Sequence, residues 1–229
     1  MKPLLSESED NDALLALGRA SVQIVHDLKN QLNGLKLYAT FLRKRLEKSD
    51  RATDELETIH KLIAGLDRSA SDLSMIVEYG QPLHLKRQPQ TDLVKLIREV
   101  VVNLNDRPQL TGSLTGSLMI NAEPGQFLGE FDSALLAGAL KSISLGAMKL
   151  ANGKQPGGVV EIRLRRGSPD TAQHGVIEWP VIDSSDHDPF HSFAGSNEIR
   201  LSLAARVIEA HGGTARRQAE NLCVRLPLT

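Results

Sequence analysis

Residues 25–35 read "VHDLKNQLNGL" and place His26 directly beside Asp27. Asn30 follows one helical turn later, on the same helical face as His26. From Asn11 to about Lys48, apolar residues recur at intervals of three and four, as in an amphipathic helix. The apolar stripe consists of Leu14, Leu17, Val22, Val25, Leu28, Leu32, Leu35, Leu37 or Tyr38, Phe41 and Leu42. The sequence therefore predicts a long helix that carries an imidazole and a carboxylate side by side.

The next segment predicts a second helix and a hairpin. The polar stretch "EKSDRATDE" offers Ser49, Asp50 and Thr53 as N-caps, and a second apolar stripe runs from Leu56 to Val77. Two helices cannot bury two wide apolar stripes by themselves. We therefore expect a homodimer in which two hairpins form a four-helix bundle. The alternative is that the hairpin packs onto the C-terminal region.

After Pro82 the pattern mixes helices and strands. Helical patterns are "TDLVKLIREVVVNLN", "DSALLAGALKSISLGAMKLAN" and "SNEIRLSLAARVIEAHGG", and the strand patterns are "SLMINA", "GEFD", "GGVVEIRLRRG", "HGVIEWPVID" and "NLCVRLPL". The predicted fold class is α+β, with an N-terminal helical hairpin over residues 13–82 and an α/β sandwich over 83–229. Residues 1–12 are expected to be flexible.

Composition and charge restrict the class of protein. The 27 basic residues nearly balance the 28 acidic ones, which argues against a nucleic-acid or anionic-membrane partner. The single cysteine, Cys223, excludes an intrachain disulfide and fits a reducing compartment. No apolar run approaches the roughly 18 residues that span a bilayer, and the acidic N-terminus is unlike a secretory signal. We expect a cytoplasmic protein without a membrane segment.

Several stretches together resemble the core of two-component histidine kinases. They are the His-Asp-x-x-Asn segment at 26–30, the link "TDLVKLIREVV", the helix "FDSALLAGALKSI" and the tail "LAARVIEAHGGTARR…CVRLPL". The resemblance covers nearly the whole chain from Ala20. It implies a dimerising hairpin whose histidine accepts a phosphoryl group, followed by a sandwich of the histidine-kinase ATPase type. Gln31 stands where the family usually has a helix-kinking proline.

The family's nucleotide-binding elements are altered in this chain. The family carries asparagines on the helix at 132–150 that hold magnesium and phosphates, and here Ser142 and Gly146 occupy those positions. Glycine has no side chain with which to ligate Mg²⁺. Of the family's Asp-x-Gly-x-Gly element, Asp183 remains but both glycines are absent. The span from Asp183 to the next helix is also too short for a full nucleotide lid.

The family's glycine-rich phosphate loop is replaced by "EIRLSLA", with Glu198, Arg200 and Ser202 at positions where small residues are expected. A phosphate loop needs glycines so that backbone N–H groups approach the ligand closely. We therefore expect a degenerate ATPase-like domain that binds no ATP productively, and a protein that needs no cofactor and holds no metal of its own.

The remaining chemistry lies on the first helix. The chain is expected to be a histidine phosphotransferase in which His26 relays phosphoryl groups between receiver-domain aspartates. Asp27 would fix the imidazole tautomer, and Asn30 matches the family position that orients water. The receiver, which brings its own Mg²⁺, is expected to dock on Lys29, Gln31, Asn33 and Lys36.

Other interpretations remain open. The chain could be a divergent histidine kinase that autophosphorylates His26, or a pseudokinase that binds or dephosphorylates a response regulator. His26 could also be a structural residue at a helix interface. A metal site at Asp186, His187, Asp188 and His191 is disfavoured, since the family's lid falls there. His211, at a helix C-terminus, is expected to be structural, with a partly cationic ring that suits the helix dipole.

Overall fold

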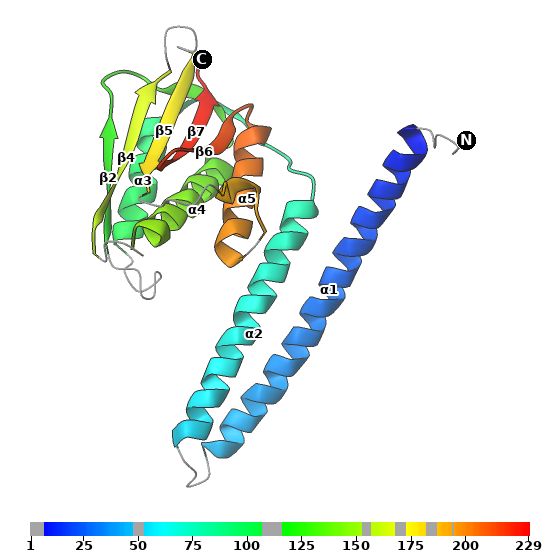
Figure 1. The fold of residues 1–229 in the computed structure, drawn as a ribbon. Coiled ribbons are helices and arrows are strands. Elements are labelled where there is room, and N and C mark those ends of the chain that lie inside the picture. Colours follow the sequence, from blue (N-terminus) through cyan, green and yellow to red (C-terminus); the bar gives the residue numbers. More distant parts are fainter. Residues whose placement is uncertain are drawn as a thin grey trace. The chain divides into compact units, whose positions relative to one another are not determined.

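The computed structural model of the chain describes residues 7–47, 53–106, 116–152, 157–167, 173–181, 187–193 and 195–229. The chain divides into two compact units, Met1–Pro82 and Leu83–Thr229, which Figure 1 shows in colours that follow the sequence. Each unit has its own packing and is considered separately.

The first unit is a hairpin of two long helices, α1 (Glu7–Leu46) and α2 (Thr53–Gly80), which lie side by side (Figure 1). Helix α1 begins at Glu7, within the segment 1–12 for which flexible chain is expected. Glu7, Glu9 and Asp10 supply the reason, since acidic residues are favoured in the first turns of a helix by its dipole.

The hairpin leaves much of its apolar surface exposed. Ala39 is the one fully buried apolar side chain among the described residues of this unit. Seven large apolar side chains are between 43% and 68% exposed: Leu28, Leu35, Leu37, Tyr38, Phe41, Leu42 and Leu62. The described helices therefore bury only part of the apolar stripes that the sequence contains.

The second unit has two sheets. Strands β2 (Ser117–Ala122), β4 (Val159–Arg166), β5 (His174–Pro180), β7 (Asn221–Pro227) and β6 (Thr214–Gln218) form a five-stranded sheet in that order. The β2–β4 pair is parallel and the other pairs are antiparallel. Strands β1 (Gln88–Asp92) and β3 (Leu128–Phe131) form a separate two-stranded sheet.

Three helices, α3 (Leu93–Asn105), α4 (Ser133–Asn152) and α5 (Ser196–Ala210), cover one face of the larger sheet (Figure 1). A short 3₁₀ helix, η3 (Pro189–His191), packs against α5. The core lies between the sheet and the helices. Every second residue along the strands points into this core, as the strand patterns predict. These core residues are Leu118, Ile162, Leu164, Ile177, Trp179, Leu222, Val224 and Leu226. The predicted α+β class is confirmed.

Two helices of the second unit are capped by aspartates. The backbone N–H of Val94 donates to Asp92 Oδ1 (2.9 Å) at the start of α3, and Leu135 N–H donates to Asp132 Oδ1 (3.1 Å) at the start of α4. Strand β6 was not predicted. Its sequence "TARRQ" has only one buried apolar residue, Ala215, so it shows no apolar alternation.

Among the described residues, one helix is long and apolar enough to cross a membrane by length and composition. It is the stretch Ser133–Ala151 of α4, with a mean hydropathy of 1.3. Its residues Leu136, Leu140 and Ile143 are fully buried in the core, and this burial accounts for its apolar composition.

Candidate functional site

The His26 segment lies within α1, which continues through Gln31 without interruption. The side chains of His26 and Asp27 lie outside the described residues, so a solvent-facing imidazole stays a prediction. Around them, Leu28 and Asn30 are exposed and Lys29 is half-buried. The described positions next to the histidine are thus accessible within one hairpin.

The other predicted docking residues lie further along the same helix. Gln31 and Asn33 are exposed. Lys36 Nζ lies 2.5 Å from Asp67 Oδ1, which forms an ion pair between α1 and α2. Lys36 therefore has a partner within the hairpin, and because both side chains remain partly exposed the ion pair is a weak one.

The altered nucleotide positions on α4 lie against α5. Gly146 is buried, and a Cβ atom placed on it would come within 2.9 Å of Leu201 Cδ2, closer than real Cβ contacts. Leu201 itself is fully buried. Ser142, one helical turn earlier, is half-buried. The glycine thus permits a close contact between two helices, and a leucine side chain occupies the space beside it.

The segment that resembles the phosphate loop is helical. "EIRLSLA" lies in the N-terminal half of α5 and begins in its first turn, where Glu198 is half-buried; Arg200 is exposed. Ser202 is buried, and its Oγ donates a hydrogen bond to the backbone carbonyl of Ser192 (2.8 Å). These side chains are therefore held in a regular helix whose backbone N–H groups bond within it.

The chain before α5 is joined to the sheet edge. Asp188 Oδ1 accepts hydrogen bonds from the backbone N–H groups of Phe190 (3.0 Å) and Arg217 (3.3 Å), and Phe190 is fully buried. Asp183 and Asp186 lie outside the described residues. In the part of the chain that the structure describes, no group of three or more His, Cys, Asp or Glu side chains is arranged to hold a metal ion.

The start of α4 is bonded to the end of α5. His211 is buried; its Nε2 accepts a hydrogen bond from the backbone N–H of Asp132 (3.0 Å), and Nδ1 lies 2.7 Å from the Val207 carbonyl oxygen. Both ring nitrogens of His211 therefore have backbone partners, which fix the ring at the junction of the two helices.

The same junction holds an ionised carboxylate. Asp132 accepts backbone hydrogen bonds from Leu135 and from Lys86 (2.8 Å for the latter), and these bonds lower the pKa of its carboxyl group below the ordinary value. The Asp132 carboxylate thus joins the start of α4 to the chain at Lys86, and the Asp132 backbone N–H joins it to the end of α5. The sequence offers Asp132 or Ser133 as the cap of this helix and gives no signal for the contact of Asp132 with His211, which lies 79 positions away.

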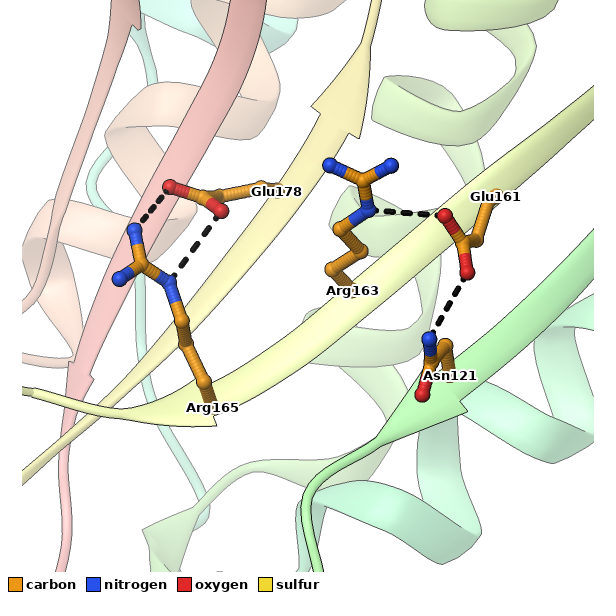
Figure 2. Close-up of polar contacts among 5 residues, drawn as sticks. All are labelled: Asn121, Glu161, Arg163, Arg165 and Glu178. Carbon is orange, nitrogen blue, oxygen red and sulfur yellow. Dashed lines mark hydrogen bonds and ion pairs between the residues drawn. The ribbon is translucent and has the colours of Figure 1, made fainter.

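The opposite face of the five-stranded sheet carries charged side chains (Figure 2). Arg165 donates two hydrogen bonds to Glu178 across β4 and β5, and Glu161 accepts from Asn121 (2.8 Å) and Arg163 (2.8 Å). The Asn121 amide and the Arg163 guanidinium lower the pKa of Glu161, and Glu178 raises that of Arg165. These exposed pairs order the uncovered face and add little stability.

The helical hairpin, followed by an α/β sandwich with helices on one face of its sheet, is the fold of the two-component histidine kinase core. The comparisons with known proteins support this class. No protein-family model matches the chain. The sequence is 25% identical over 228 residues to the sensor histidine kinase ZraS of Klebsiella oxytoca, which covers 93% of this chain. The chain spans 45% of the length of that curated relative.

Two solved structures share the fold. Full-length ShkA in complex with AMPPNP matches with a TM-score of 0.60 at 16% identity, over 90% of this chain and 45% of that one. Histidine kinase ThkA in complex with the response regulator TrrA also matches with a TM-score of 0.60, at 17% identity, over 97% of this chain and 65% of that one. At these identities the likeness establishes the fold.

Proposed function

We propose that this chain is a histidine phosphotransferase of a two-component phosphorelay, located in the cytoplasm. One imidazole nitrogen of His26 attacks the phosphorus of a receiver's aspartyl phosphate. An N–P bond forms, the O–P bond breaks, and the receiver regains its aspartate carboxylate. The reverse step passes the phosphoryl group to a second receiver. Asp27 accepts a hydrogen bond from the other ring nitrogen and offsets the positive charge that develops on the ring.

The observation that carries the proposal is the contact between Gly146 and Leu201. In histidine kinases the position of Gly146 holds an asparagine that serves magnesium and phosphate, and here the space beside it is filled by a buried leucine side chain. Neither the glycine nor the leucine supplies an oxygen ligand, which Mg²⁺ requires. This contact argues against a magnesium–nucleotide complex at this position, and no step of the proposed reaction uses one.

The helical course of "EIRLSLA" supports the same conclusion. A phosphate-binding loop presents free backbone N–H groups, whereas those of this segment from Ile199 onward are bonded within the helix. Ser202 also donates its hydroxyl to Ser192. Reopening a nucleotide pocket here would require loss of buried contacts on both sides of α5.

Receiver domains are the partners that we propose. The solved complex of ThkA is with a response regulator, and the fold of this chain matches ThkA. Next to His26, the described residues Asn30, Gln31 and Asn33 are exposed, and Lys29 supplies positive charge for an acidic receiver pocket. The Mg²⁺ that the transfer uses belongs to the receiver.

The proposed active form is a homodimer. The exposed apolar side chains of the hairpin include Leu35 and Phe41, at 54% and 58%. A second hairpin can bury these surfaces in a four-helix bundle, which removes apolar area from water.

The test uses the full chain and labelled phosphate. Incubated with a phosphorylated receiver, the protein should acquire acid-labile label, and His26→Ala should acquire none. Incubated with γ-labelled ATP and Mg²⁺ but no other protein, it should stay unlabelled. Lys44→Ala, at an exposed position of α1, is the control for both reactions.

A second candidate is an autophosphorylating histidine kinase, which the sequence similarity to ZraS and the fold shared with ShkA favour. Label on His26 from ATP alone would establish it and end the phosphotransferase proposal. A third candidate, a pseudokinase, predicts a different result for the same variant: His26→Ala would keep both regulator binding and the biological effect.

A further inference from the structure

A small pocket opens beside the last two strands, remote from the contact between α4 and α5. It is lined by His174, Gly212, Gly213, Thr214, Arg216 and Arg225 and has a volume of about 250 Å³. In the register of the sheet, Arg225 pairs with both Thr214 and Val176, and His174 pairs with Pro227. These positions alternate with the buried residues Val224 and Leu226, so they lie on the face that no helix covers.

Two side chains that line the pocket have unsatisfied nitrogen atoms. Among the described side chains, Nδ1 of His174 and Nε of Arg225 are buried and make no hydrogen bond. Buried polar atoms in folded proteins nearly always have a partner, because leaving one unsatisfied is destabilising. Because both residues line the same pocket, an acceptor bound there would meet side chains whose hydrogen-bonding capacity is incompletely used.

The charge of the pocket specifies the ligand. Two guanidinium groups and an imidazole line it, and none of its described lining residues is acidic. The nearby Glu178 carboxylate is already bonded to Arg165 by two hydrogen bonds. A ligand with several acceptor oxygens and negative charge would match these donors, since guanidinium groups bind oxyanions in a bidentate manner.

The guanidinium group of Arg216 is held in place by a neighbouring side chain. With the Gln218 amide oriented so that its oxygen faces Arg216, that oxygen accepts from Arg216 Nη2 (2.8 Å) and Nε (2.9 Å). The opposite wall is the turn at Gly212, whose φ of +79° is the left-handed conformation that ends α5. The pocket is smaller than sites for drug-sized ligands, which favours a single phosphate group over a whole nucleotide.

We propose that this pocket binds a phosphate-class oxyanion through Arg216, Arg225, His174 and the Thr214 hydroxyl. The ligand is inorganic phosphate or the terminal phosphate of a small metabolite. The site is independent of the proposed phosphoryl transfer, since it lies on the other face of the sheet from α4 and α5 and involves no residue of α1.

The test is a titration of the full chain with inorganic phosphate at constant ionic strength, followed by amide resonances and by calorimetry. The resonances of Gly212, Gly213 and Thr214 should shift saturably. Arg225→Gln and Arg216→Gln should each weaken binding by about tenfold or more, as expected for the loss of one charge-assisted hydrogen bond. Arg163→Gln is the matched control, because Arg163 lies on the same face but is bonded to Glu161.

The outcomes distinguish the source of the phosphate. The site is supported if inorganic phosphate binds saturably to the parent chain and to the control, and if the two pocket variants lose this binding. If ATP binds more tightly at the same resonances, a nucleotide is the source of the phosphate. Unfolding temperatures of the variants establish that they fold. The proposal would be overturned if the parent chain did not bind phosphate, bound it without saturation, or bound it no more tightly than Arg216→Gln. The Arg216 side chain is exposed.

Discussion

The imidazole of His211 accepts a hydrogen bond at 3.0 Å from the backbone N–H of Asp132, which joins the C-terminus of α5 to the N-terminus of α4. The ring also packs near Phe131, with 5.9 Å between the ring centroids. The two helices on which the nucleotide elements would lie are thus fixed to each other at this end by a fully buried histidine.

Replacing His211 should destabilise the second unit. In His211→Ala the Asp132 N–H loses its acceptor and the ring leaves a cavity, so we expect a loss of about 2 to 3 kcal/mol in the free energy of unfolding. Urea denaturation measures it. His191→Ala, at an exposed position, should change stability by less than about 0.5 kcal/mol, and equal losses in the two variants would contradict the assigned role.

The lowered pKa of Asp132 predicts a pH dependence with a definite sign. A carboxyl group whose pKa is depressed in the folded state stabilises it above the unfolded pKa, near 4, and that contribution is lost as the pH falls through the lower folded value. Asp132→Asn should therefore be less stable than the parent at neutral pH, and the difference should shrink below about pH 4. Unfolding curves from pH 7 to 3 measure it. Glu130→Gln, on the exposed side of β3, is the control, and a constant difference at all pH values would argue against an ionised cap.

Two glycines of α4 should respond oppositely to alanine. Gly146→Ala places a methyl group 2.9 Å from Leu201 Cδ2, so we expect destabilisation of about 1 to 3 kcal/mol. Gly138→Ala meets nothing within 4 Å and should stabilise the helix by about 0.5 to 1 kcal/mol. Thermal unfolding of both variants measures the contrast. A stabilised Gly146→Ala would show that α4 and α5 are not closely packed, and the argument against nucleotide binding would then lose its main support.

The proposed dimer predicts a specific sensitivity of the hairpin. Phe41→Glu places a charge on the exposed apolar surface of α1, and we expect it to weaken self-association by tenfold or more, roughly the effect of no longer burying one aromatic side chain. Sedimentation velocity at several concentrations measures it. Lys44→Glu, an exposed polar position of the same helix, should leave association unchanged. A parent chain that is monomeric at all concentrations would exclude the bundle.

The features that depend on local sequence were predictable. Asp92 and Asp132 each precede an apolar helical pattern, and both are caps in the structure. Strand β6 was not predicted because its arginines give it no apolar alternation. It forms a strand through its pairing with β7. The contact of Asp132 with His211 could not be predicted, since it joins residues that only the tertiary fold brings together.

The candidate site was predictable to a lesser extent. Asn30, Gln31 and Asn33 are exposed, and both their docking role and the role of His26 remain predictions that rest on the sequence. The meaning of Gly146 changed with the structure. In the sequence it is a missing magnesium ligand, and in the fold it is a packing residue that a buried leucine requires.

The distribution of aromatic residues makes the two units optically distinguishable. The single tryptophan, Trp179, is fully buried in the sandwich and donates its indole N–H to Ser144 Oγ on α4 (3.0 Å). Both tyrosines of the chain, Tyr38 and Tyr79, belong to the hairpin. Indole emission therefore reports melting of the sandwich alone, and phenol absorbance reports the hairpin, so unlabelled wild-type protein suffices to ask whether the two halves unfold together or one after the other.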